Sequence, residues 1–245
     1  AKPTGISRSW SEPADRRQPQ PEIKGAAMRV IPPSHEILFL PSAEEALRLI
    51  ELAGRTCYKS EHRIDEGSAA DFIGRILRSG HESVIEHANM TVKFICDRGV
   101  SHELVRHRLA AYSQESTRYA NYSQDRFGSE ITVIKPCFWE EGSEAYRVWQ
   151  ESMEQAEKAY MRLLDIGARP QEARSVLPNS LKTEVVMTAN FREWRHVFRM
   201  RCQKRAHPQI REVTLGLLKE VKERIPVLFD DLHAEFKGEM EAFGL

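Results

Sequence analysis

The sequence lacks a net charge, because 36 lysines and arginines balance 36 aspartates and glutamates. This balance excludes a surface that is positive throughout, as in a general nucleic-acid coat protein, although it leaves room for a local positive patch. The chain also lacks an apolar run approaching the ~20 residues that cross a bilayer, and its first residues lack the apolar stretch of a secretory signal. We therefore expect a cytoplasmic protein that does not enter a membrane.

Cysteine is scarce, and the four cysteines stand far apart without a CxxC pair. This spacing excludes a zinc ribbon and a pair of neighbouring redox thiols, so we expect buried free thiols in a reducing compartment. Only Cys202 suggests more, because it directly follows Arg201, a cation that could lower its thiol pKa and create a nucleophile. Helical neighbours one position apart do not face each other, which disfavours a catalytic Cys202.

Glycine-rich nucleotide loops are absent as well, since the sequence contains neither a GxGxxG nor a Walker pattern. A nucleotide bound by this chain would be held by something other than a glycine loop at a helix N-terminus. Internal repeats are also missing, which excludes a solenoid or a propeller.

The chain divides into a tail and one domain. Residues 1–27 carry four prolines and scattered charges without an apolar period, which predicts an extended or disordered tail. The domain, residues 28–245, alternates irregularly between strand and helix patterns and therefore predicts an α+β fold, with a mixed or antiparallel sheet flanked by helices and no Rossmann glycine loop. We expect strands over 88–96, 131–134 and 182–189, and helices over 42–57, 68–80, 100–108, 143–166, 171–176, 191–204 and 210–225. The first of these helices is expected to begin with a capping box of Ser42 and Glu45, and the second with Ser68 as its cap.

The basic residues are mostly arginine, 25 against 11 lysines. Arginine grips phosphate and carboxylate with a planar fork of donors, but an excess of arginine alone is more often a matter of base composition or adaptation to heat. Position is more informative. The run Arg106-His107-Arg108 is expected on the last turns of a helix, and three basic groups together there favour an anionic ligand.

Histidine is the obvious candidate for a metal ligand, because His81, His87, His102 and His107 fall within 27 residues. The segment from His102 to His107 superficially resembles the HExxH motif of zinc peptidases. Histidines five apart on a helix lie about 140° apart around its axis, however, and the adjacent arginines would repel a dication. We predict no metal site.

Several short motifs carry a resemblance to a known family. The run at 106–108 (RHR), followed after seven residues by Ser116, resembles the signature of the flavin-dependent thymidylate synthases, and residues 115–119 (ESTRY) resemble one of its usual variants. Residues 81–87 (HESVIEH), 174–178 (RSVLP) and 190–192 (NFR) with Arg201 resemble the family's HExxxEH, RxxLP and NxR…R segments. Matching order and spacing run from about Met28 to the final helices.

The resemblance implies that FAD is the cofactor, held at the interfaces of a homotetramer, and that NADPH and methylenetetrahydrofolate are co-substrates. The arginines of the RHR run would take the FAD phosphates through charge-assisted hydrogen bonds. His81 would border the channel by which folate reaches the flavin. The implied cofactor-binding residues are His81, Ser83, Glu86, Arg106, His107, Arg108, Gln114, Asn190, Phe191, Arg192 and His196.

The substrate implied by the resemblance is dUMP, which would be methylated to dTMP without a cysteine nucleophile. Arg201 would be catalytic, because a guanidinium that stays protonated can stabilise an ionised uracil ring. The phosphate would be held by Ser116, Arg118 and Arg174. The implied substrate-binding residues are Glu103, Leu104, Val105, Arg106, Gln114, Glu115, Ser116, Thr117, Arg118, Arg174 and Arg201.

Four positions depart from the family's usual residues: Ser83 stands where many members have Thr, Glu103 where many have Gln, Gln114 where many have Glu, and His196 where many have Asn.

Two other classes of function also stay open. The seven basic residues from 192 to 211 could form a nucleic-acid-binding helix with Arg195, Arg199 and Arg205, or simply a solvated face. The chain could instead be a flavin-storing or structural homologue without activity.

Overall fold

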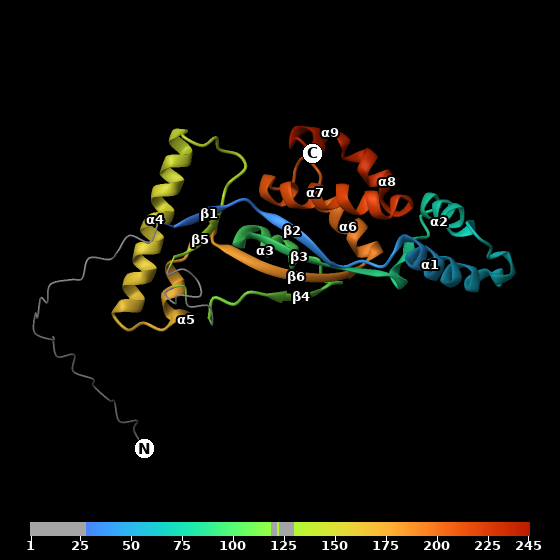
Figure 1. The fold of residues 1–245 in the computed structure, drawn as a ribbon, viewed down its shortest axis with the longest axis horizontal. Coiled ribbons are helices and arrows are strands. Elements are labelled where there is room, and N and C mark those ends of the chain that lie inside the picture. Colours follow the sequence, from blue (N-terminus) through green and yellow to red (C-terminus); the bar gives the residue numbers. More distant parts are fainter. Residues whose placement is uncertain (1–27, 119–121, 123–129) are drawn as a thin grey trace, which may run out of the picture.

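The structure is a computed structural model that describes residues 28–118, 122 and 130–245 (Figure 1). The tail predicted for residues 1–27 lies outside the described residues. At the centre is an antiparallel sheet in the order β2-β3-β6-β4, built from Ser34–Phe39, Asn89–Asp97, Lys182–Asn190 and Ala111–Gln114. A short parallel pair, β1 (Arg29–Ile31) with β5 (Thr132–Ile134), extends the fold at one end.

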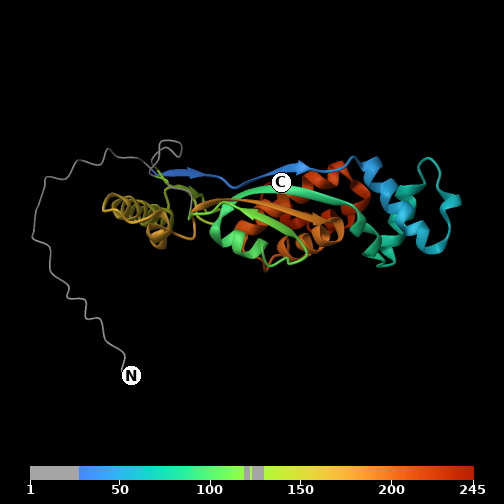
Figure 2. The same cartoon turned by 90° about the horizontal axis from the view of Figure 1, so that it is seen from below.

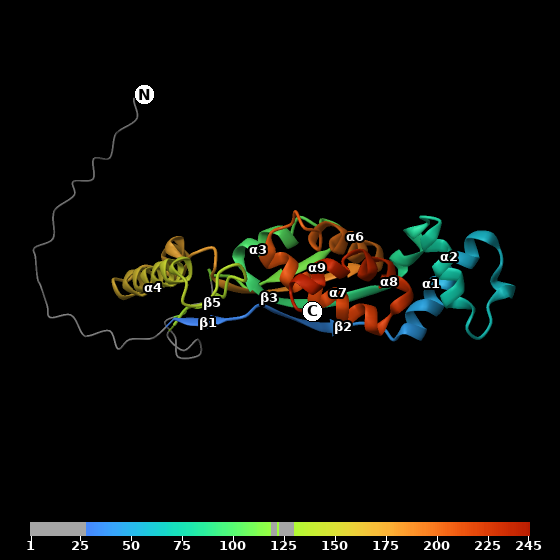
Figure 3. The same cartoon turned by 90° about the horizontal axis from the view of Figure 1, so that it is seen from above.

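Helices flank this sheet, which confirms the predicted α+β class. α6 (Phe191–Arg201), α7 (Pro208–Arg224), α8 (Pro226–Glu235) and α9 (Lys237–Ala242) lie over one face (Figures 1 and 3). The strands lie in front of these helices when the molecule is seen from the opposite side (Figure 2). α1 (Ala43–Tyr58) and α2 (Ser68–Arg78) lie at one end, and α4 (Glu144–Asp165) and α5 (Pro170–Ala173) at the other.

The core lies between the sheet and the helices. Met90, Val92, Phe94 and Cys96 alternate along β3 and are all fully buried, as the period of two predicts. Trp194 of α6 packs on this surface, with its ring centroid 6.2 Å from that of Phe94. This packing fixes α6 over the central strands, and α6 carries several of the predicted site residues.

Helix boundaries agree with the sequence where local capping determines them. The hydroxyl of Ser42 accepts a hydrogen bond from the Glu45 amide, and the Glu45 carboxylate accepts from the Ser42 amide, forming the predicted capping box. The predicted cap at Ser68 is wrong. Gly67, with φ of 91°, caps α2, because the Ser68 hydroxyl donates instead to the Glu51 carboxylate of α1.

The largest correction concerns α3 (Arg98–Leu104), which ends before the RHR run that it was expected to carry. The Tyr112 hydroxyl of β4 shares its one proton between the backbone carbonyls of Leu104 and His107, at 2.7 and 2.8 Å. These bonds satisfy carbonyls that helix propagation would otherwise have to pair. The RHR residues therefore lie in a turn. α6 similarly ends at Arg201, earlier than the expected residue 204.

Short 3₁₀ helices complete the fold at Glu61–Arg63 (η1), Glu82–His87 (η2) and Arg174–Val176 (η4). η2 contains most of the HExxxEH motif, and η4 begins the RxxLP motif. Within the described residues, every helix is too short or too polar to cross a membrane.

Candidate active site

Arg201 lies at the centre of a group of predicted site residues. Its Nη1 and Nη2 donate to the Oε2 and the backbone carbonyl of Glu103 at 2.6 and 3.0 Å, and its Nε donates to His107 Nε2 at 3.0 Å. The last residue of α6 is thus bound to α3 and to the RHR turn. Residues of two separate motifs therefore meet here, together with Glu103.

His107 is the buried member of this group, with 5% of its surface exposed. Burial lowers its pKa to about 4, and the positive charge of Arg201 and the neighbouring His196 act in the same direction. The imidazole is therefore neutral at pH 7. A neutral ring can accept a hydrogen bond at Nε2, which is what the donor nitrogen of Arg201 requires.

His107, Glu193 and His196 also have the donor atoms of a metal site, within 4.8 Å of one another. Sequence reasoning missed this group, because only Glu193 and His196 are close in sequence, three apart on α6. Nε2 of His107 accepts from Arg201, so coordination through Nδ1 would require the ring to lose its remaining proton. The adjacent guanidinium would also repel a dication. The prediction of no metal site therefore stands as a prediction.

The two arginines of the RHR run face outward. Arg106 and Arg108 are exposed and line a cavity of about 510 Å³ together with His102 and Val105. Among the residues that the structure describes, no carboxylate forms an ion pair with either arginine. Two exposed cations beside a cavity without a carboxylate are suited to phosphate groups.

A second cationic group surrounds the end of β4. Arg174 of η4 donates from Nη1 to the Thr117 hydroxyl at 3.3 Å, and the Ser116 hydroxyl accepts from the Arg118 amide at 3.3 Å. The structure thus brings the RxxLP arginine to the segment 116–118, although 57 residues separate Arg174 from Thr117. A phosphate placed here would meet hydroxyl and guanidinium donors together.

Several predicted ligand-binding residues have side chains that serve the fold instead. The Gln114 amide donates to the hydroxyls of Ser101 and Thr183, and the Glu115 carboxylate pairs with Lys182 at 3.1 Å. The side chains of Leu104 and Phe191 are fully buried in the core. The side chains of Leu104 and Phe191 are therefore not available to a ligand.

The remaining cofactor-binding residues gather around the N-terminal end of α6. Asn190 caps this helix, because its Oδ1 accepts from the Glu193 amide at 2.9 Å. Arg192 forms an ion pair with Glu86 of η2. The side chains in this group are exposed or half-buried and comprise His81, Ser83, Glu86, Asn190, Arg192 and His196.

α6 therefore carries residues of two predicted groups. One group lies at its first residues and the other at Arg201, and His196 between them lies edge-on to His107 of the Arg201 group, with ring centroids 5.5 Å apart. The two groups therefore adjoin along this helix.

Two of the three arginines that were considered for a nucleic-acid-binding helix form ion pairs within the chain. Arg195 is 1% exposed and forms ion pairs with Glu82 and Asp231. Arg199 donates to Glu82 at 2.7 Å. Only Arg205 of that predicted trio is exposed, so the alternative of a nucleic-acid-binding helix loses two of its three arginines.

The four cysteines are free, but they are not all buried. Cys96 and Cys202 are fully buried, and burial raises the pKa of Cys202 to about 12. Cys57 is exposed and Cys137 is half-buried, so the expectation of buried thiols is wrong for Cys57. Because the Cys202 thiol stays protonated at neutral pH, it is a poor nucleophile.

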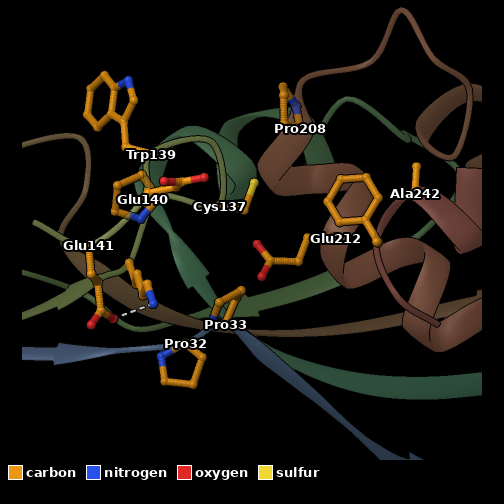
Figure 4. A pocket seen from close by; sticks show the side chains of 12 residues that line it. Pro32, Pro33, Cys137, Trp139, Glu140, Glu141, Pro208, Glu212 and Ala242 are labelled. Carbon is orange, nitrogen blue, oxygen red and sulfur yellow. Dashed lines mark hydrogen bonds and ion pairs between the residues drawn. The ribbon is translucent and has the colours of Figure 1, made fainter. Parts of the chain in front are cut away.

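A larger cavity, of about 720 Å³, lies beside the N-terminal end of α7 and contains none of the predicted site residues (Figure 4). Glu212 points into it, and burial raises the pKa of this carboxylate. No motif indicated this cavity, because its walls come from segments far apart in the sequence. They are formed by Pro32, Pro33, Lys135, Pro136, Cys137, Trp139, Glu140, Glu141, Pro208, Glu212, Ala242 and Phe243.

Comparison with known proteins identifies a family whose members match most of this chain. A family model described as thymidylate synthase complementing protein matches residues 39–227. A flavin-dependent thymidylate synthase of Geobacter sulfurreducens is 34% identical over 203 residues, which cover 80% of this chain and 86% of the relative. One from Pyrococcus furiosus is 36% identical over 177 residues, covering 72% of each chain.

A solved structure has the same arrangement of elements. A UMP/dUMP methylase, PolB from Streptomyces cacaoi, bound with 5-Br dUMP, aligns with a TM-score of 0.69 and 25% sequence identity. The alignment covers 85% of this chain and 98% of that chain. The shared fold therefore extends over nearly all of that protein.

Proposed function

This chain belongs to the thymidylate synthase complementing protein family, and we propose that it is a flavin-dependent thymidylate synthase that methylates dUMP to dTMP. The observation that carries the proposal is the meeting of Arg201, Glu103 and His107 through three hydrogen bonds. This cluster joins motifs that are nearly a hundred residues apart. It holds a permanent cation in a fixed, half-buried position, where it can stabilise negative charge on a uracil ring.

The proposed reaction uses methylenetetrahydrofolate as the carbon donor and NADPH as the reductant. A bond forms between the methylene carbon and uracil C5, and C5 loses its proton. Both bonds from that carbon to folate nitrogens break, and the two nitrogens take up two protons, which equal in number the one lost by C5 and one from solvent. NADPH supplies the hydride that completes the methyl group, so the products are dTMP, tetrahydrofolate and NADP⁺. FAD, when bound, supplies the redox chemistry that connects NADPH to the carbon acceptor.

The chain's own residues have separate tasks in this proposal. Ser116, Arg118 and Arg174 bind the dUMP phosphate, and Arg201 stabilises the ionised uracil. The exposed guanidinium groups of Arg106 and Arg108 fit the phosphates of FAD, because they line a cavity and pair with no described carboxylate. The fit of the cofactor to this chain rests on these two arginines.

A cysteine nucleophile is not needed in this reaction. The fully buried Cys202, with its raised pKa, supports that part of the proposal. A homotetramer with shared active sites is also proposed. Both features follow the family resemblance.

Two measurements on the full-length protein test the proposal. The first is the visible absorption spectrum of the purified protein, with FAD added where the protein is colourless, and we expect flavin bound to protein. The second is NADPH oxidation in the presence of methylenetetrahydrofolate, which we expect to depend on dUMP. Flavin binding without dUMP-dependent turnover would instead identify a flavin-storing homologue.

A comparison of dUMP with UMP sharpens this test, because the aligned PolB is described as a UMP/dUMP methylase. We expect turnover with dUMP. Preferred turnover with UMP would assign this chain to nucleotide methylation other than thymidylate synthesis. Steep, salt-dependent binding of DNA without flavin binding would support the alternative of a nucleic-acid-binding helix.

A further inference from the structure

Glu193 is a buried carboxylate that none of the family motifs includes. It lies on the first turn of α6 and is 6% exposed. Its Oε1 is 3.5 Å from Nδ1 of His107, the cluster member that accepts from Arg201. A buried carboxylate is costly unless donors compensate it, and His107 and His196 each have a ring nitrogen within 4.8 Å of a Glu193 carboxylate oxygen.

The hydrogen bond from Arg201 determines the proton position on His107. A guanidinium has only donors, so the Nε2 atom that it contacts must carry a lone pair. The neutral ring then has its single proton on Nδ1, and that proton faces Glu193. In the opposite tautomer, two N–H groups would face each other across 3.0 Å, and Glu193 would face an unprotonated nitrogen.

We infer that Glu193 is a positioning residue that holds His107 in the tautomer protonated on Nδ1, so that Nε2 fixes the guanidinium of Arg201. Its consequence for dUMP turnover rests on the proposed function. The tautomer itself does not. Glu193 thus acts through His107 rather than on a ligand, as the acceptors behind metal-bound or catalytic histidines do in other proteins.

The other groups around His107 agree with this assignment. His196 of α6 lies edge-on to His107, with ring centroids 5.5 Å apart, and Tyr112 of β4 donates to the His107 backbone carbonyl. Glu103 of α3 is on the far side of the Arg201 guanidinium. Arg201 is therefore held from two sides, by Glu103 directly and by Glu193 through His107.

The tautomer can be measured in the free protein by NMR of the full-length chain labelled with ¹⁵N at histidine, assigned with a His107→Gln variant. We expect the signal of a neutral ring protonated on Nδ1 at pH 7 in the wild type and in Glu193→Gln, whose amide oxygen can still accept. In Glu193→Leu we expect a shift toward the form protonated on Nε2. Glu223→Leu, which changes an exposed carboxylate of α7, is the matched control and should leave the His107 signal unchanged.

Kinetics provide the second readout. We expect Glu193→Leu to lower kcat/KM for dUMP about tenfold, or ~1.4 kcal/mol, and Glu193→Gln to stay within about threefold of the wild type. A merely structural role would lower both variants' activity in proportion to their loss of stability, measured by thermal unfolding.

The two proposals can fail separately. A wild-type His107 protonated on Nε2, or a tautomer unchanged in Glu193→Leu, would overturn the positioning role whatever the activity. An Nδ1 proton in a protein that cannot turn over dUMP would keep the positioning role and remove the proposed function. The wild-type spectrum decides the first point even if Glu193→Leu does not fold.

Discussion

The carboxylate of Glu103 and the guanidinium of Arg201 form a half-buried ion pair, with Oε2 and Nη1 2.6 Å apart. Many members of the flavin-dependent thymidylate synthase family have Gln at position 103. A glutamine would supply an acceptor without a negative charge. In this chain the charge of Arg201 is therefore partly compensated before any ligand binds. The effect of the Glu103 charge on turnover can therefore be tested by substitution.

Glu103→Gln should keep the hydrogen bond to Arg201 and remove the opposing charge. We expect kcat for dUMP to rise about two- to fivefold, because an uncompensated guanidinium stabilises an anionic ring more strongly. Glu103→Ala, which removes the acceptor as well, should lower kcat. A large loss of turnover in Glu103→Gln would show that the carboxylate itself contacts the substrate.

Replacing Arg201 should remove most of the activity. We expect Arg201→Ala to lower kcat about 10²–10³-fold, the effect of losing one electrostatic stabiliser of a developing anion. Arg201→Lys should also be impaired, because an ammonium cannot contact Glu103 and His107 with the same fork. FAD binding, followed by absorption, is the control. Full turnover and unchanged dUMP affinity in Arg201→Ala would show that the assignment is wrong.

Stability should decrease in mild acid through His107. Burial lowers its folded-state pKa to about 4 from an ordinary value near 6.5, so between these two pH values the unfolded chain binds the extra proton. The free energy of unfolding should therefore fall as the pH falls from about 6.5 to about 4. Urea unfolding at pH 7 and pH 4.5 measures this difference, which should be smaller in His107→Gln. An equal difference in both proteins would contradict the low pKa.

Arg195 should matter to stability far more than Arg205. Arg195→Met removes a buried cation that pairs with Glu82 and Asp231, and we expect a loss of about 3 kcal/mol in the free energy of unfolding. Arg205→Met, at an exposed position, should change it by about 0.5 kcal/mol or less. Chemical denaturation measures both. Similar small effects would mean that the buried network is energetically neutral.

Cys202→Ser should leave kcat nearly unchanged, because a buried thiol with a pKa near 12 does not supply a thiolate at neutral pH. Cys57→Ser, at the exposed cysteine, is the control for the substitution itself. A fall of several orders of magnitude in turnover for a folded Cys202→Ser protein would establish a thiol nucleophile.

Strong periodic patterns predicted the long elements of this fold well. β3, β6 and α4 lie where alternation or helical spacing placed them, because burial along one face determines both the pattern and the structure. The end of α3 was misplaced, since Tyr112 of a separate strand terminates that helix. Such a tertiary contact leaves no signal in the local sequence.

In the candidate site, too, some residues were predictable from local sequence and others depend on tertiary packing. Motif resemblance indicated Arg201 and His107 individually, and their contact agrees with it. The neighbouring Glu193 could not be found in that way, because it lies outside every motif and reaches His107 only after α6 packs on the sheet. Similarly, burial of Leu104 and Phe191 depends on the whole core, so their unavailability as side-chain ligands was not predictable.

The most direct test of the account is the fate of the folate carbon. The full-length protein, loaded with FAD, is incubated with dUMP, NADPH and methylenetetrahydrofolate labelled with ¹³C at the methylene carbon, and the nucleotide product is analysed by mass spectrometry. We predict dTMP with the label in its methyl group, formed by the wild type and formed about 10²–10³-fold more slowly by Arg201→Ala. Absence of labelled dTMP from a flavin-bound, folded wild-type protein would contradict the proposed function.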